Sequence, residues 1–344
     1  MKRFSITCIS TMILLGGIWY TDSINANELP ATTCNVSCMN QWGSEITYVV
    51  AYDGLRNLVF AGCREHICML DVSNPNVPLI ISDFELSALT LCGIQYDEIS
   101  SRLYLLLGGE GFEIWDITQS KMPSKISSYD TKGYTCGLAI NDPYVYVADA
   151  DAGLQVIDVS DPSSPTDITA LDMTCATSVT ISGHYVYVTD LGLRILDISK
   201  PNRPEEISYL ETPGVSRDVH VEGHYAYVAD DWKGIRVIDI SDKTRPYEVG
   251  NIITSGYAWD IDLAGSNLYV AACGGGLKVI DVLDPTKPYE ITVTTPSREA
   301  LGVAVAGQHA YVAQATSGLG IYSSEPTRGN SSSIKSPSDL AACR

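Results

Sequence analysis

The stretch YVYVADADAGLQVIDVSDP, residues 144–162, contains two short runs of β-branched and aromatic residues, 144–148 and 154–159, joined by a turn rich in Asp, Ala and Gly. Such runs separated by turn residues predict a β-hairpin. Residues 137–140 and 167–171 flank it with two further strand-like runs, again bounded by Asn, Asp, Pro and Ser. The sequence therefore predicts a unit of four antiparallel strands.

This unit recurs along the chain. An apolar pair, Asp, another apolar residue and usually Ser or Thr occur at 69–73, 114–118, 156–160, 195–199, 237–241 and 279–283, and a degenerate copy lies at 318–323. Subtraction of residue numbers places successive aspartates 45, 42, 39, 42 and 42 residues apart. Four strands in about 40 to 45 residues are typical of a β-propeller blade, which needs neighbouring blades to bury its faces. Seven second strands can be counted, so we expect an all-β, seven-bladed propeller over residues 27–323.

The last blade ends after its third strand. Residues 30–45 precede the first strand of the first blade, and we expect them to supply the missing outer strand. That arrangement would join the two ends of the ring and cover an open sheet edge. Residues 324–344, rich in Ser, are predicted to be a disordered tail.

The repeat resembles the LVIVD family of extracellular and cell-surface propeller repeats. The resemblance rests on residues 144–149 and 153–162 and on their copies, notably 225–242, and extends over about residues 47–323. Leu283, Ser323 and an irregular first blade depart from the pattern. The resemblance implies a propeller fold and a location outside the cytoplasm.

The N-terminus has the pattern of a secretory signal peptide. Lys2 and Arg3 precede the apolar run 13–20, and Asn25-Ala26 offers a cleavage point. Since the apolar run is well short of the roughly 20 residues that span a bilayer, we expect cleavage after residue 26 and no transmembrane anchor thereafter. The predicted location is secreted, periplasmic or at the cell surface.

The formal net charge is −19. Such an acidic chain excludes nucleic acid as a partner, because phosphate binding requires concentrated Lys and Arg. An acidic surface most often maintains solubility. No cofactor and no metal site are predicted, although calcium is left open.

Nine of the ten cysteines follow the signal peptide, and export would allow many of them to form disulfides. Cys63 and Cys68 flank a short loop and should stand roughly opposite each other, which makes them the first disulfide candidates. Cys92 and Cys136 occupy equivalent positions in neighbouring blades, and Cys175 enters the next blade slightly earlier. A second disulfide is expected between two of these three. A zinc site formed by Cys63, His66 and Cys68 is a weaker alternative, because a second pair of ligands is missing.

The aspartate of each repeated motif is expected to be structural. A residue required in every blade fits a scaffold role, here accepting a hydrogen bond from the turn that follows the strand. The aspartates concerned are Asp71, Asp116, Asp158, Asp197, Asp239 and Asp281. Asp149, Asp190 and Asp230, after the second strands, receive the same interpretation.

Positions that differ between blades are better functional candidates, because the scaffold does not require them. The clearest lie in the predicted first strands, which surround the central channel, and in the loops leading into them. The candidates are Asp218, His220, Asp260 and Asp262 at the channel mouth, with Arg217, Tyr257 and Trp259 at its rim. They could bind a cation, act as an acid/base pair or hold a sugar, or they could simply line a hydrated channel.

Two functions are therefore considered. The first is a secreted interaction module that binds an extracellular protein or a glycan. The second is an extracytoplasmic enzyme that uses the acidic and His residues of the channel mouth on a saccharide or small metabolite. No nucleophile elbow, metalloprotease helix or phosphate-binding loop is present in the sequence, which favours the module.

Overall fold

The computed structural model describes residues 36–42, 46–63, 65–87, 90–293 and 299–324. These residues form seven four-stranded antiparallel sheets and no helix. The first blade consists of β2 (Thr47–Asp53), β3 (Leu58–Cys63), β4 (His66–Asp71) and β5 (Leu79–Glu85). The second consists of β6 (Gly93–Asp97), β7 (Arg102–Leu106), β8 (Phe112–Asp116) and β9 (Ser124–Tyr129). The third consists of β10 (Gly137–Asn141), β11 (Tyr144–Ala148), β12 (Leu154–Asp158) and β13 (Thr166–Leu171). The order within each blade follows the chain.

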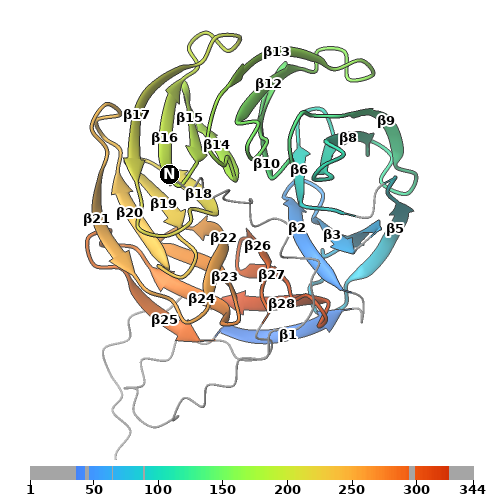
Figure 1. Cartoon of the computed structure of the whole chain (residues 1–344). Coiled ribbons are helices and arrows are strands. Elements are labelled where there is room, and N and C mark those ends of the chain that lie inside the picture. Colours follow the sequence, from blue (N-terminus) through green and yellow to red (C-terminus); the bar gives the residue numbers. More distant parts are fainter. Residues whose placement is uncertain (1–35, 43–45, 64, 88–89, 294–298, 325–344) are drawn as a thin grey trace, which may run out of the picture.

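The remaining blades repeat this order until the last one. Their strands are β14 (Ser178–Ser182), β15 (Tyr185–Thr189), β16 (Gly192–Asp197) and β17 (Glu205–Glu211); β18 (Asp218–Glu222), β19 (Tyr225–Ala229), β20 (Ile235–Asp239) and β21 (Tyr247–Ile252); β22 (Tyr257–Ala264), β23 (Asn267–Cys273), β24 (Gly276–Asp281) and β25 (Tyr289–Val293); and β26 (Gly302–Ala306), β27 (His309–Ala313), β28 (Leu319–Ser324) and β1 (Val36–Trp42). The blades stand around a central axis, with the first strand of each blade innermost (Figure 1). The predicted seven-bladed propeller is confirmed.

The ring is closed by the N-terminal strand. β1 pairs antiparallel with β28, from Val36 opposite Ser324 to Trp42 opposite Leu319, so the blue and red ends of the described chain meet in one sheet (Figure 1). The expectation that residues 30–45 complete the last blade is therefore confirmed for β1. The pairing supplies hydrogen-bond partners to a strand edge that would otherwise be open.

The core consists of apolar layers between neighbouring blades. Tyr146 and Val156 of the third blade, for example, pack in one cluster with Val186 and Val188 of the fourth. These four side chains are buried completely, and burial of one such side chain stabilises the fold by about 1.5–3 kcal/mol. Because each layer belongs to two blades, the stability of a blade depends on its neighbours.

The repeated motif aspartates have the structural role that was predicted. Each accepts a hydrogen bond from the backbone N–H two residues further on, at 2.7–2.9 Å, and so fixes the turn that follows the third strand. The hydrogen bonds from Ser160, for example, lower the pKa of Asp158. The motif recurs in these blades because its aspartate fixes this turn.

The expectation that Cys63 and Cys68 stand opposite each other is wrong. The two-residue turn places Cys63 opposite His66, and Cys68 stands opposite Ala61 instead. The cysteines are thus diagonal neighbours, whose Cα separation of about 7–8 Å exceeds the usual span of a disulfide. Among the cysteines whose side chains the structure describes, no disulfide is present; these are Cys63, Cys68, Cys92, Cys136, Cys175 and Cys273.

The predicted signal peptide, 1–26, lies outside the described residues, as do Cys34, Cys343 and all but the first residue of the predicted tail. Within the described ranges, no helix is long and apolar enough to cross a membrane.

Candidate functional site

The channel is lined unevenly. The strand register places Ser178, Asp218 and Asp260 at one equivalent position of three successive first strands, where Gly137 and Gly302 stand in the flanking blades. The residues two positions further along these first strands, from the third blade to the seventh, are Ala139, Thr180, His220, Asp262 and Ala304. The polar side chains therefore gather on the arc formed by β14, β18 and β22. The structure thus brings the four predicted channel-mouth residues together.

The carboxylates on this arc link neighbouring blades. Asp218 accepts the backbone N–H of Ile261 at 3.0 Å and the hydroxyl of Ser178 at 2.7 Å. Asp260 and Asp262 accept the backbone N–H groups of Val303 and Val305, each at 2.7 Å. The first strand of a blade has a free edge towards the channel, and these carboxylates satisfy N–H groups on that edge. Their geometry therefore serves blade-to-blade cohesion.

Asp260 is the most perturbed acid of the arc. Its burial and the neighbouring carboxyl of Asp218, with which it shares a hydrogen bond, raise its pKa well above the ordinary value. Burial also raises the pKa of Asp262, although the N–H of Val305 and the nearby His220 oppose the shift. Nδ1 of His220 lies 3.7 Å from Oδ1 of Asp262, and both side chains are about 30% exposed. Asp260 therefore holds a proton more tightly than an isolated Asp side chain does.

An aromatic patch lies beside this arc, on the face of the ring where first strands begin and second strands end. An antiparallel bridge between Asp231 and Ala258 brings Trp232 opposite Tyr257. The two side chains are 49% and 51% exposed. We call Trp232, Tyr257 and Trp259 the aromatic patch.

An ion pair lies against Trp259, one residue of the patch. The guanidinium of Arg217 donates two hydrogen bonds to one carboxylate oxygen of Asp231, at 2.8 and 2.7 Å, and its Cζ lies 5.6 Å from the centre of the Trp259 ring. Arg217, Tyr257 and Trp259 were predicted at the rim, whereas Trp232 and Asp231 were missed. Both lie in the turn between β19 and β20, and the unusual Trp in a turn otherwise made of Asp, Lys and Gly was the available signal.

A comparison with protein families identifies the type of repeat. The model of the LVIVD repeat matches residues 132–172, 175–212, 213–254, 255–295 and 297–321, which is more than half of the chain. This chain belongs to the LVIVD repeat family. The five matches correspond to blades three to seven, so the aromatic patch and the polar arc lie within LVIVD repeats, and the first two blades share their topology outside the matched segments.

Solved structures share the fold alone. The chain resembles the computationally designed Ika8 protein (TM-score 0.62, 10% identity, 83% of this chain and 98% of that one) and the β-propeller domain of Myceliophteria thermophila Cps50 (Swd1) (0.71, 11%, 84% and 99%). A chain of the Mitotic Checkpoint Complex is similar at a TM-score of 0.70 and 10% identity, over 90% of this chain and 98% of that one. No curated protein matches the sequence.

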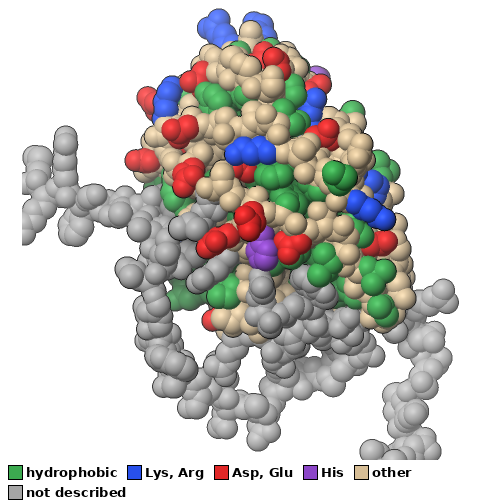
Figure 2. Space-filling view, turned by 90° about the vertical axis from the view of Figure 1, so that its right-hand side faces the viewer, with side chains coloured by type: hydrophobic (Ala, Val, Ile, Leu, Met, Phe, Trp, Pro, Cys, Tyr) green, Lys and Arg blue, Asp and Glu red, His purple; other side chains and the backbone are tan. Residues whose placement is uncertain are grey.

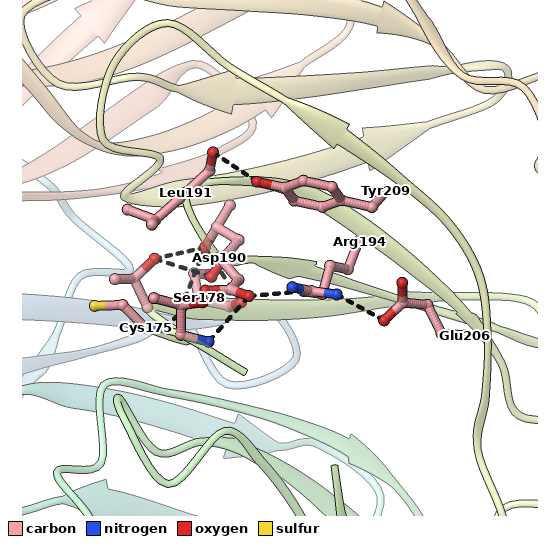
Figure 3. A network of polar contacts seen from close by, with 10 residues as sticks. Cys175, Ser178, Asp190, Leu191, Arg194, Glu206 and Tyr209 are labelled. Carbon is pink, nitrogen blue, oxygen red and sulfur yellow. Dashed lines mark hydrogen bonds and ion pairs between the residues drawn. The ribbon is translucent and has the colours of Figure 1, made fainter. Parts of the chain in front are cut away.

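A second set of aspartates fastens the loops that lead into the LVIVD blades. Asp190 is 1% exposed and accepts the backbone N–H groups of Thr174 and Cys175, at 3.2 and 2.7 Å, and Nε of Arg194 at 2.7 Å (Figure 3). Arg194 reaches on to Glu206 of the outer strand, again at 2.7 Å. The network ties the loop, the second hairpin and the outer strand of one blade together.

The same arrangement occurs in the blades on either side. Asp149 accepts the N–H of Gly133 at 2.8 Å, and Asp230 accepts that of Gly214 at 2.9 Å. Burial raises the pKa of both carboxyls, and their hydrogen bonds counteract it. The structural interpretation of Asp149, Asp190 and Asp230 agrees with these contacts, and these three residues are called the loop aspartates below.

Because the pKa of Asp260 is raised, the stability of the protein should depend on pH. In the folded protein Asp260 retains its proton to a higher pH than in the unfolded chain, so the folded state binds more protons between the two pKa values and stability falls as pH rises through that window. The Asp260→Asn variant keeps a neutral donor and acceptor at this position. We expect the free energy of unfolding of wild type, relative to this variant, to decrease from about pH 4 upwards.

Urea denaturation of both proteins across that pH range measures the difference. Asp161→Asn is the control, because hydrogen bonds with Ser163 lower the pKa of this exposed carboxylate. The stability of wild type relative to Asp161→Asn should therefore rise with pH. A wild-type advantage over Asp260→Asn that grows with pH would contradict the account.

Proposed function

We propose that this LVIVD protein is an extracytoplasmic binding module that holds a glycan on the aromatic patch. The observation that carries the proposal is the backbone bridge between Asp231 and Ala258, which brings the half-exposed Trp232 and Tyr257 to neighbouring positions of two blades, close in sequence to Trp259. Single exposed aromatic residues are common, but several that gather on one part of a surface often mark a recognition site.

The surroundings of the patch suit a sugar. A pyranose ring offers apolar C–H faces that stack on aromatic rings and hydroxyl groups that need hydrogen-bond partners. Arg217, whose side chain is 20% exposed, supplies a guanidinium beside Trp259, and the buried carboxylate of Asp231 holds it in a fixed orientation. Fixing these groups in advance lowers the entropic cost of binding.

Export is part of the proposal. The charged start, the short apolar run and the small residues around Asn25-Ala26 support a signal peptide, and glycans are abundant outside the cytoplasm. N-terminal sequencing of protein recovered from the culture medium or periplasm tests this; a mature chain beginning near residue 27 is expected, and an intact Met1 in the cytoplasm would refute it.

The enzyme alternative rests on one observation, the raised pKa of Asp260 beside Asp218. Raised carboxyl pKa values are typical of general acids. Against it stand the backbone N–H groups that these carboxylates already bind. If the alternative holds, Asp260→Asn should abolish turnover of a bound saccharide, whereas the module predicts unchanged binding by this variant.

Loss of an aromatic ring tests the proposed site. Trp232→Ala and Tyr257→Ala should each weaken glycan binding about tenfold or more, which corresponds to about 1.4 kcal/mol, because each removes a stacking surface. A glycan array selects the ligand, and isothermal titration calorimetry on the purified mature protein gives the dissociation constants.

Tyr247→Ala is the matched control. Tyr247 is 56% exposed, much like Tyr257, but it lies on the outer strand β21, and we expect its variant to bind like wild type. Equal affinities for all three variants would exclude the aromatic patch, and capture of a peptide in place of any glycan would assign the patch to a protein partner.

A further inference from the structure

Three potential metal ligands meet on one face of the first blade. His66 and Cys68 are two residues apart on β4 and therefore point to the same side of the sheet. Asp83 of β5 stands directly opposite Cys68 in the strand register, and Glu85 stands opposite His66. Two paired strands thus present His, Cys and carboxylate side chains on a single face.

The ligand atoms are already close. Nδ1 of His66 lies 2.9 Å from Oδ1 of Asp83, and the ligand atoms of His66, Cys68 and Asp83 all lie within 4.8 Å of one another. Ligands around a tetrahedral zinc ion, at bond lengths of about 2.0–2.3 Å, stand roughly 3.5 Å apart. Small side-chain movements would bring the three atoms to that spacing.

The exposed fraction of the three side chains increases from Cys68 to Asp83. Cys68 is 5% exposed, whereas the side chains of His66 and Asp83 are 25% and 48% exposed. An ion could therefore enter from the Asp83 side and reach the sulfur at the base. The side of the ring that carries β5 and β9 presents many acidic side chains (Figure 2). Asp83 and Glu85 stand opposite Cys68 and His66 in the strand register. Negative charge around the cluster favours a cation.

We propose that His66, Cys68 and Asp83 form a site for zinc or a similar divalent transition metal, with water or Glu85 completing the coordination. Thiolate and imidazole ligands together select such metals over calcium and magnesium, which prefer oxygen. Three protein ligands and an exchangeable fourth position are typical of open zinc sites. Export would place this site where the metal is taken from the surroundings.

The set differs from the zinc alternative considered from sequence, which used Cys63. Sγ of Cys63 lies 3.6 Å from Oγ1 of Thr47, on the side of the inner strand β2. Asp83 replaces it, although it lies 15 residues along the chain from Cys68 and 17 from His66. Strand pairing, which a linear motif does not reveal, supplies the third ligand.

Cobalt substitution tests the site on the untagged, reduced mature protein. Co²⁺ should produce a thiolate-to-metal charge-transfer band in the near ultraviolet and tetrahedral bands in the visible, and Zn²⁺ should bleach both. Zn²⁺ should also raise the unfolding temperature, since it binds the folded state. Calcium should do neither at the same concentration.

Variants assign the ligands. Asp83→Asn affects an exposed side chain and should weaken Zn²⁺ binding by about tenfold or more without altering the fold, and Cys68→Ser should remove the charge-transfer band. Asp130→Asn and Cys273→Ser, in other blades, should bind like wild type. An unchanged cobalt spectrum in both Asp83→Asn and Cys68→Ser, or the absence of any band with wild type, would overturn the proposal.

Discussion

Replacement of Asp190 by alanine is expected to lower the free energy of unfolding by about 3 kcal/mol. The variant loses three hydrogen bonds at once and leaves the backbone N–H groups of Thr174 and Cys175 without their buried acceptor. Arg194 keeps Glu206 at 2.7 Å, and for this reason the expected loss lies at the lower end of the range for broken buried ion pairs. Urea denaturation at neutral pH, followed by tryptophan fluorescence, measures it.

Asp197→Ala provides the matched control. Asp197 also accepts a backbone N–H, that of Ser199 at 2.7 Å, but its carboxylate faces solvent, where water replaces the lost partner. We expect a far smaller loss than for Asp190→Ala. If the two variants were equally stable, the loop aspartates would not fasten the blades as described.

Removal of the N-terminal strand should open the ring. A chain beginning at Ile46 lacks β1, so the last blade keeps three strands and β28 presents an unpaired edge. We expect the unfolding temperature to fall by about 10 °C or more, because several kcal/mol of strand pairing are lost, and the open edge should promote association. Circular dichroism during heating and size-exclusion chromatography measure the two effects.

A permuted chain distinguishes lost pairing from general damage. Val36 stands opposite Ser324, so a two-residue Asn-Gly turn can join the end of β28 to residues 36–42 as a tight hairpin. In this chain β1 follows β28 instead of preceding β2. We expect the unfolding temperature of the full-length protein to return. A permuted chain no more stable than the truncated one would show that β1 does not close the ring in the manner observed.

The sequence was sufficient for the fold because the repeat is periodic at two levels. Alternating apolar residues specify each strand, and the aspartate before the third turn recurs with nearly constant spacing. The contacts of Asp158 and its equivalents then follow from local geometry, since donor and acceptor are two residues apart. Closure by β1 was predictable for a topological reason, because one blade lacked an outer strand.

The candidate site was predictable only in part. Asp218 and Asp260 could be placed in neighbouring first strands by counting, but their bonds to Ile261 and Val303 depend on how one blade faces the next. Trp232 joined the aromatic patch through a bridge between the β19–β20 turn of one blade and the start of β22 in the next. The error at Cys63 arose from turn length, because a two-residue turn shifts the partner of Cys68 to Ala61.

The most direct test of the proposed function is a crystal structure of the mature protein with the glycan selected on the array. The account predicts a sugar ring stacked against Trp232 and Tyr257, with a hydroxyl group near the guanidinium of Arg217. A saccharide bound in the channel against Asp218 and Asp260, with the aromatic patch bare, would contradict it and would favour the enzyme alternative.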